Sequence, residues 1–197
     1  MLFRSGDYTG AAAAVYKYGS DLTGAVIACA LFERGQRGST LAQQAKYLPR
    51  AYLIALRLGV ERVFWYEFQA PETDDLDQES HFGIVHRDLA PKPAYLAYRT
   101  LVAQRPAGSV TQERPWRSED GAYYYPQWTR PDGQPAGAVW AFQTSGPRRL
   151  TFSSPKAIIT AHTGEPVPAR WQGRTCVLPL SDAPLYFAGA ALESMGE

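Results

Sequence analysis

The most informative run in this 197-residue sequence is Arg62-Val63-Phe64-Trp65-Tyr66-Glu67-Phe68. Its apolar residues predict a buried strand over Val60–Phe68. In a strand, side chains alternate between two faces. Trp65, Glu67 and Gln69 should therefore share one face. The aromatic residues Phe64, Tyr66 and Phe68 should share the other.

A helix is predicted directly before this strand. Ser39 or Thr40 can cap its N-terminus, and Gln43 is placed to complete a capping box. Apolar side chains then recur at three- and four-residue steps until Gly59, which closes the helix. Upstream, Ala25–Phe32 is continuously apolar, which is typical of a strand covered on both faces. Strand, helix and strand together predict a βαβ unit with two adjacent parallel strands.

Two further helices are expected in the first half of the sequence. Ala11–Tyr18 is rich in alanine, and Gly19 follows at the position of a C-terminal cap. Another helix should run from about Pro91 to Ala103. The acidic segment 72–79 before it lacks the ligand spacing of an EF-hand, so it is interpreted as a solvated loop rather than a calcium site.

The character of the sequence changes at Arg105–Gly108. Beyond this linker, short alternating segments are separated by turn residues about every ten positions, which is typical of an antiparallel sandwich. The sequence therefore predicts an α/β segment over residues 1–105 and an all-β domain over residues 110–197.

Composition excludes several classes of partner and site. Twenty basic and 19 acidic residues give a net charge of +1, so no nucleic-acid or anionic-membrane partner is expected. No apolar stretch reaches the roughly 20 residues of a membrane span. Cys29 and Cys176 lie in apolar runs, which favours buried free thiols over a disulfide or a metal site. His81 and His86 lack a third ligand at metal spacing, so neither a metal nor another cofactor is predicted.

Several motifs resemble, in their order and spacing, the last two βα units of glycoside hydrolases built on a (β/α)8 barrel. The motifs are Phe32-Glu33-Arg34-Gly35, Gln43-Gln44-Ala45-Lys46-Tyr47-Leu48, the strand run quoted above, Phe82-Gly83-Ile84-Val85 and Pro91-Lys92-Pro93-Ala94-Tyr95. Further on, Pro184–Gly189 resembles the closing strand of the β-sandwich that many such enzymes append. The resemblance implies a partial (β/α)8 barrel, strands seven and eight with their helices, followed by an antiparallel β-sandwich.

The same resemblance implies three site residues. In the resembling families the nucleophile is a Glu that ends strand seven, with a Gln-Ala helix start about ten residues later. Glu33 matches the first position and Gln44 the second, although Phe32 stands where a small hydroxyl residue is usual. Trp65 lies where related enzymes place an aromatic floor beneath the reacting sugar. Glu67 is a second carboxylate candidate, for which binding of a sugar hydroxyl or a structural role is favoured over acid/base catalysis.

The second catalytic carboxylate of these enzymes has no counterpart here. Retaining glycosidases use two carboxylates about 5 Å apart. In the resembling enzymes the acid/base follows strand four, usually as Asn-Glu, and this sequence contains no Asn. A complete barrel also needs about 250 residues. The sequence therefore predicts a C-terminal fragment of a retaining O-glycoside hydrolase, inactive alone, with carbohydrate as its ligand and exposed strand edges through which it could oligomerise.

One alternative comes from a different functional class. The chain could be a noncatalytic carbohydrate-binding or structural β-sandwich module. In that case sugar contacts should lie on sandwich aromatics such as Trp128, Trp140 or Trp171, whereas the hydrolase hypothesis places them at the three N-terminal residues named above.

Overall fold

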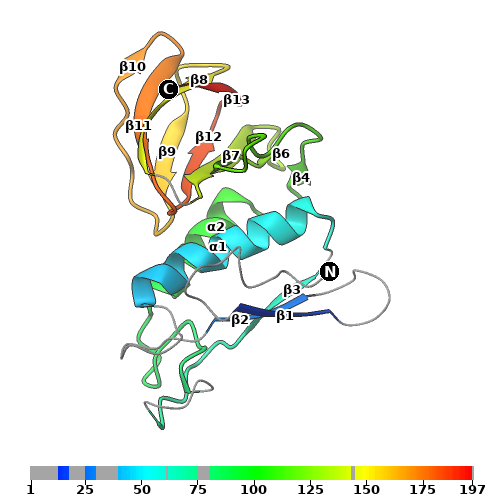
Figure 1. Ribbon diagram of the computed structural model, residues 1–197, viewed down its shortest axis with the longest axis vertical. Coiled ribbons are helices and arrows are strands. Elements are labelled where there is room, and N and C mark those ends of the chain that lie inside the picture. The colour runs from blue at the N-terminus through cyan, green and yellow to red at the C-terminus, as the bar shows by residue number, and fades with distance from the viewer. Residues whose placement is uncertain are drawn as a thin grey trace. The chain divides into compact units, whose positions relative to one another are not determined.

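The computed structural model describes residues 13–17, 25–29, 40–60, 62–74, 80–142 and 145–196. The chain divides into two compact units, residues 1–98 and residues 99–197. Figure 1 colours both along the chain, from blue at the N-terminus to red at the C-terminus.

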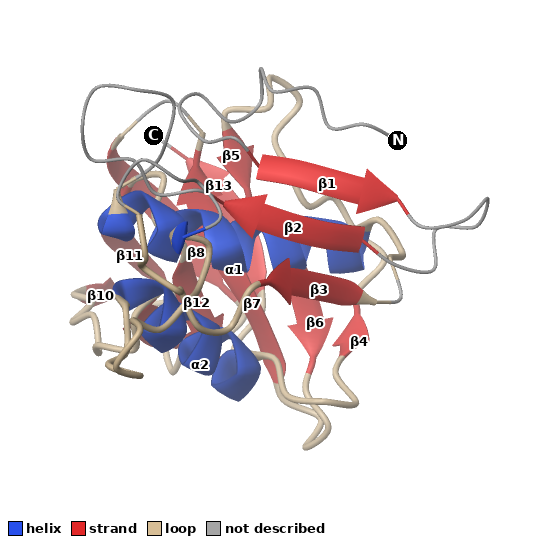
Figure 2. Cartoon of the chain, turned by 90° about the horizontal axis from the view of Figure 1, so that it is seen from below, coloured by secondary structure: helices blue, strands red, loops and turns tan. Residues whose placement is uncertain are grey.

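Unit 1 contains a three-stranded sheet of order β1-β2-β3. Its strands are β1 (Ala13–Lys17), β2 (Ala25–Cys29) and β3 (Val63–Tyr66). Strands β2 and β3 run parallel in a register that pairs Ala25 with Val63. The three strands lie side by side in Figure 2, with a long helix across one face. The predicted pair of adjacent parallel strands is thus confirmed, and β3 is shorter than expected.

The helix predicted over Ala11–Tyr18 is wrong, because its described part forms the strand β1. This strand pairs antiparallel with β2 along all five of its residues. Alanine prefers helices by only a few tenths of a kcal/mol per residue over most others. A neighbouring strand that satisfies the backbone outweighs such a preference. The antiparallel β1 also differs from the all-parallel sheet of a (β/α)8 barrel.

Helix α1 (Leu41–Arg57) begins at the predicted N-cap, Thr40. The backbone N–H of Gln43 donates to Thr40 Oγ1 at 3.1 Å, and the backbone N–H of Thr40 donates to Gln43 Oε1 at 2.8 Å. This reciprocal capping box satisfies two of the helix's orphan donors. Gly59, at φ +77°, follows the C-terminus in the left-handed region as predicted.

A long connection links β3 to helix α2 (Pro93–Gln104). Within this connection, the residues that follow β3 run beside the residues that precede α2. Gln69 bridges Val85 in parallel, and the backbone N–H of Ala70 donates to Val85 O at 3.0 Å. A Cβ on Gly83 would lie 2.0 Å from the nitrogen of Ala70. Only glycine therefore allows these two segments to approach so closely.

The described part of unit 2 is mainly antiparallel strand. The strands are β4 (Val110–Thr111), β5 (Tyr123–Tyr124), β6 (Gln127–Thr129), β7 (Pro135–Ala141), β8 (Gly146–Phe152), β9 (Ile158–Ala161), β10 (Trp171–Gln172), β11 (Thr175–Leu180), β12 (Leu185–Ala188) and β13 (Leu192–Gly196). One sheet has the order β10-β11-β8-β13. The other has the order β4-β6-β7-β12-β9, with β5 also paired to β7.

Both sheets contribute to one buried core. Its members are Val139, Ala141, Leu150, Phe152, Ala157, Ile159, Cys176, Leu178, Leu180, Phe187, Ala190 and Leu192. Within this core Cys176 is a buried free thiol, as predicted. Burial raises its pKa, which leaves the thiol protonated and inert. The side chain of Cys29 lies outside the described residues.

Two of the three tryptophans expected to bind sugar in the module alternative are buried. Trp128 and Trp140 each have 0% exposure. The guanidinium of Arg105 lies over the Trp128 ring, 5.2 Å from its centroid, and Tyr124 stacks on Trp140 at 5.3 Å. Other side chains already occupy these ring faces. The prediction that Trp128 or Trp140 stacks on sugar is therefore wrong. Trp171 alone of the three is only half-buried.

Candidate functional site

The side chains of β3 and the two residues after it alternate between two environments. Trp65 and Glu67 are half-buried. Phe64, Tyr66 and Phe68 are 57%, 45% and 59% exposed. The predicted alternation is confirmed for Trp65 and Glu67 against the three aromatic residues, whereas Gln69, which was expected on the face of Trp65, is exposed. Three aromatic side chains of unit 1 are therefore accessible on one face of this segment.

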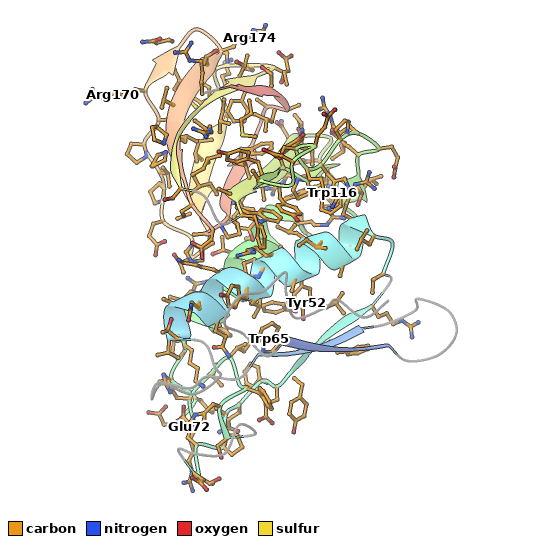
Figure 3. All side chains as sticks on the ribbon, viewed as in Figure 1. Tyr52, Trp65, Glu72, Trp116, Arg170 and Arg174 are labelled. Carbon is orange, nitrogen blue, oxygen red and sulfur yellow. The ribbon has the colours of Figure 1, made fainter. Side chains whose placement is uncertain are left out.

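Trp65 is held on the side of β3 that faces α1. Its ring packs against the cluster that contains Leu48 and Ile84, together with Tyr52 (Figure 3). The indole Nε1 donates to Phe82 O at 3.2 Å. Trp65 therefore anchors the β3–α2 connection, and the substrate contact expected of it stays a prediction.

A charged cluster lies within that connection. Glu72 Oε1 is 2.8 Å from His86 Nδ1, and the backbone N–H of Arg87 donates to Glu72 Oε2 at 3.2 Å. The Nζ of Lys92, only 1% exposed, is 3.4 Å from Glu72 Oε1. Both oxygens of one carboxylate thus tie together parts of the chain that are up to 20 residues apart in sequence.

The cluster perturbs the acidity of its members. Burial lowers the pKa of Lys92, although the charges of Glu72 and Glu67 favour its ammonium form. For Glu72, burial favours the neutral acid, but the hydrogen bonds from His86 and Arg87 and the charge of Lys92 together lower its pKa. Glu72 is therefore held as a carboxylate near neutral pH.

The cluster opens to solvent through a cavity of about 500 Å³, lined by Glu72, His86, Arg87, Asp88 and Ala90. The turn that forms its wall is fixed: the backbone N–H of His86 donates to Ala90 O at 2.8 Å, and the N–H of Ala90 donates to Asp88 Oδ1 at 2.9 Å. Carboxylate, imidazole and guanidinium groups on a rigid turn can hydrogen-bond a hydroxyl-rich ligand.

The structure brings two of the three predicted site residues to the end of β3. Trp65 lies in that strand and Glu67 follows it, within electrostatic reach of Lys92. Glu33 lies outside the described residues. The sequence does not reveal the Glu72 cluster, because an acidic segment is typical of a solvated loop and a lysine between two prolines is typical of a helix start.

Other site types find no support in the described residues. Over 40–60, 62–74, 80–142 and 145–196, His, Cys, Asp and Glu side chains form no group that could hold a metal ion. Neither α1 nor α2 combines the length and the apolar character that crossing a bilayer requires.

Solved structures of glycoside hydrolases resemble this chain. A family 39 glycoside hydrolase from the gut symbiont Bacteroides cellulosilyticus WH2 matches 77% of it with a TM-score of 0.67 and 26% identity. The catalytic domain of the family 30 xylanase C from Talaromyces cellulolyticus matches 79% with a TM-score of 0.56 and 11% identity. The family 51 arabinofuranosidase from Xanthomonas axonopodis pv. citri matches 82% with a TM-score of 0.47 and 13% identity.

The chain spans only 31%, 36% and 38% of the lengths of these three structures. No family model matches the sequence, and no curated protein matches it. The likeness therefore concerns the fold, over about one third of the family 39 chain.

Proposed function

We propose that this chain corresponds to the C-terminal part of a retaining O-glycoside hydrolase, with residues 1–105 as part of a (β/α)8 barrel and residues 110–197 as the appended β-sandwich. The observation that carries the proposal is the match to the family 39 structure, at 26% identity over 77% of this chain. The parallel pairing of β2 with β3 supports it, because strands of such barrels are parallel.

In this proposal Glu33, which follows β2 in sequence, is the nucleophile. Its carboxylate attacks the anomeric carbon, the bond to the leaving oxygen breaks, and a covalent glycosyl-enzyme forms. Water then hydrolyses that ester and regenerates the carboxylate. Protonation of the leaving oxygen and deprotonation of the water require a second carboxyl group, which the resembling enzymes carry after strand four.

The residues at the end of β3 would bind the sugar rather than react with it. Glu67 and the Glu72 cluster offer acceptors and donors for hydroxyl groups. In this proposal Trp65 contacts the sugar ring. The accessible ring of Tyr66 offers a second aromatic surface on the opposite face of the strand.

Activity assays on the purified chain test this proposal. No turnover of nitrophenyl xylosides, glucosides or arabinofuranosides is expected, because the acid/base contribution of about 10²–10⁴ is missing, even though a nitrophenol leaving group needs little acid help. A 2-deoxy-2-fluoroglycosyl fluoride needs no proton donor for its leaving group. We expect it to add one glycosyl mass to the Glu33 peptide, and Glu33→Gln to abolish the adduct.

The claim that the chain is inactive and the claim that Glu33 is the nucleophile can be contradicted separately. Hydrolysis that disappears in Glu33→Gln would contradict inactivity but support the nucleophile. Hydrolysis or labelling that survives this substitution would contradict the role of Glu33. Glu113→Gln, which changes an exposed glutamate in unit 2, is the matched control and should alter neither result.

A further inference from the structure

A second cavity, of about 360 Å³, lies wholly within unit 2. It is a groove beside β13, the edge strand of its sheet. The lining residues are Arg114, Pro115, Ser118, Tyr125, Gln127, Leu192, Glu193, Ser194 and Met195. Its volume falls in the lower part of the range typical of small-molecule sites.

Hydrogen bonds preorganise the floor of the groove. Gln127 is 3% exposed, and its amide bonds both backbone groups of Leu192: Nε2 donates to Leu192 O at 3.0 Å, and Leu192 N–H donates to Oε1 at 2.9 Å. The hydroxyl of Tyr125 donates to Arg117 O at 2.8 Å, which fixes its ring. A ligand would therefore meet a surface that is already ordered, at little entropic cost.

The lining combines apolar surface with charges of both signs. Tyr125, Pro115 and Met195 offer surface for the C–H face of a ring. Arg114 and Glu193 bring a guanidinium and a carboxylate. Glu193 is itself held by Arg174, whose Nη1 donates to Oε2 at 2.9 Å (Figure 3 labels Arg174).

This combination selects a class of ligand. Opposite charges in one small groove disfavour a simple anion or a simple cation. Planar charged groups beside an aromatic ring suit a neutral molecule with hydroxyl groups at its rim and an apolar face. We propose that this groove binds a short neutral saccharide, of one or two sugar units. The site does not involve Glu33 or the end of β3, so it goes beyond the proposed catalytic function and can stand without it.

Titration of the ¹⁵N-labelled full chain with xylobiose, cellobiose or arabinobiose tests the proposal by NMR. We expect at least one disaccharide to shift the amide signals of Tyr125, Glu193 and Ser194, with a dissociation constant of about 1 mM or weaker. Glu193→Gln should weaken binding about tenfold, because a charged acceptor is lost. Ser194→Arg should block the groove. Glu165→Gln, on an exposed turn of the same unit, is the matched control and should leave binding unchanged.

The spectra also show whether each variant is folded, so lost binding and lost structure are separable. Glu33→Gln and Glu67→Gln should leave the groove shifts unchanged, which separates this site from the proposed catalytic function. The proposal is overturned if tens of millimolar disaccharide shift no groove signal. It is also overturned if Ser194→Arg binds as well as the original chain, or if shifts are confined to Phe64, Tyr66 and Phe68.

Discussion

Gln44 of α1 and Trp65 of β3 donate to the same acceptor, the backbone oxygen of Phe82. The Gln44 Nε2 and the Trp65 Nε1 each lie 3.2 Å from that oxygen. Phe82 is 7% exposed, so water cannot readily replace either donor. This shared carbonyl ties helix, strand and connection together, and it fixes the segment from which the charged cluster projects.

A double-mutant cycle at these two residues should show coupling. Trp65→Phe should cost about 1 kcal/mol, the usual net value of one hydrogen bond. Gln44→Leu should cost less, because it also removes a buried Oε1 for which the described residues offer no hydrogen-bond partner. The double variant leaves the Phe82 oxygen with neither donor and should lose about 1 kcal/mol more than the sum.

Urea unfolding followed by circular dichroism at 222 nm, where α1 contributes strongly, measures these losses. Gln69→Leu removes a bond from an exposed glutamine to Arg87 O and is the matched control. It should have little effect. Strict additivity of the two single substitutions would contradict a shared, buried acceptor.

Because of Glu72, the stability of unit 1 should decrease at acidic pH. Its pKa in the folded state is lowered from the ordinary value of 4.5, since bonds from His86 and Arg87 and the charge of Lys92 outweigh burial. A carboxylate with a depressed folded pKa contributes stability that is fully present above its unfolded pKa. That stability is lost as pH falls through the folded pKa.

Thermal unfolding of the original chain and of Glu72→Gln between pH 7 and pH 3 measures this contribution. The difference in Tm should be constant above about pH 5 and should shrink below pH 4.5. Lys92→Met keeps most of the buried volume but removes the charge that lowers the pKa of Glu72. The loss of stability should therefore begin at a higher pH. A Tm difference that stays unchanged down to pH 3 would contradict a stabilising role for the Glu72 carboxylate.

Gly137 of β7 lies directly beneath the ring of Phe187 on β12. A Cβ on Gly137 would lie 2.2 Å from Phe187 Cζ and 2.8 Å from Pro126 O. Gly137→Ala should therefore destabilise unit 2 by about 1–3 kcal/mol, the usual cost of overpacking. Phe187→Leu should relieve part of the clash, so the substitution should cost less in that background.

Gly196→Ala provides the control for this effect. Gly196 also lies in a strand of unit 2, and nothing comes within 4 Å of a Cβ built there. It should be neutral or slightly stabilising, because alanine restricts the unfolded chain. Equal losses from the two glycine substitutions, measured by urea unfolding, would show that the ring of Phe187 is not the cause.

Local signals in the sequence were sufficient for several elements and insufficient for others. The capping box at Thr40 and Gln43 involves residues three apart, so the start of α1 could be predicted. Strand β1 depends on pairing with β2, which overrides the helix preference of alanine. The contact of Glu72 with Lys92 depends on how the connection folds back, and a charged residue between prolines gives no local sign of burial.

Proteolysis should distinguish the two units. Unit 2 buries a core that draws on two sheets, and the Nε1 of Trp128 donates to Gln104 O at 3.1 Å, which ties the end of α2 to it. Unit 1 carries the exposed rings of Phe64, Tyr66 and Phe68. We expect chymotrypsin to cut unit 1 first, on the N-terminal side of the Arg105–Gly108 linker. A resistant fragment of about residues 99–196 should remain.

The exposed aromatic face of β3 should also drive association, because apolar surface and free strand edges favour pairing with another chain. Phe64→Lys should shift the chain towards monomer in size-exclusion chromatography with light scattering. Val177→Lys, at a site of similar exposure in unit 2 (54% against 57%), should not. If the first hundred residues prove monomeric and as resistant to chymotrypsin as the rest, unit 1 is self-sufficient. It would then need no further strands to cover it, and the partial-barrel proposal would lose its physical basis.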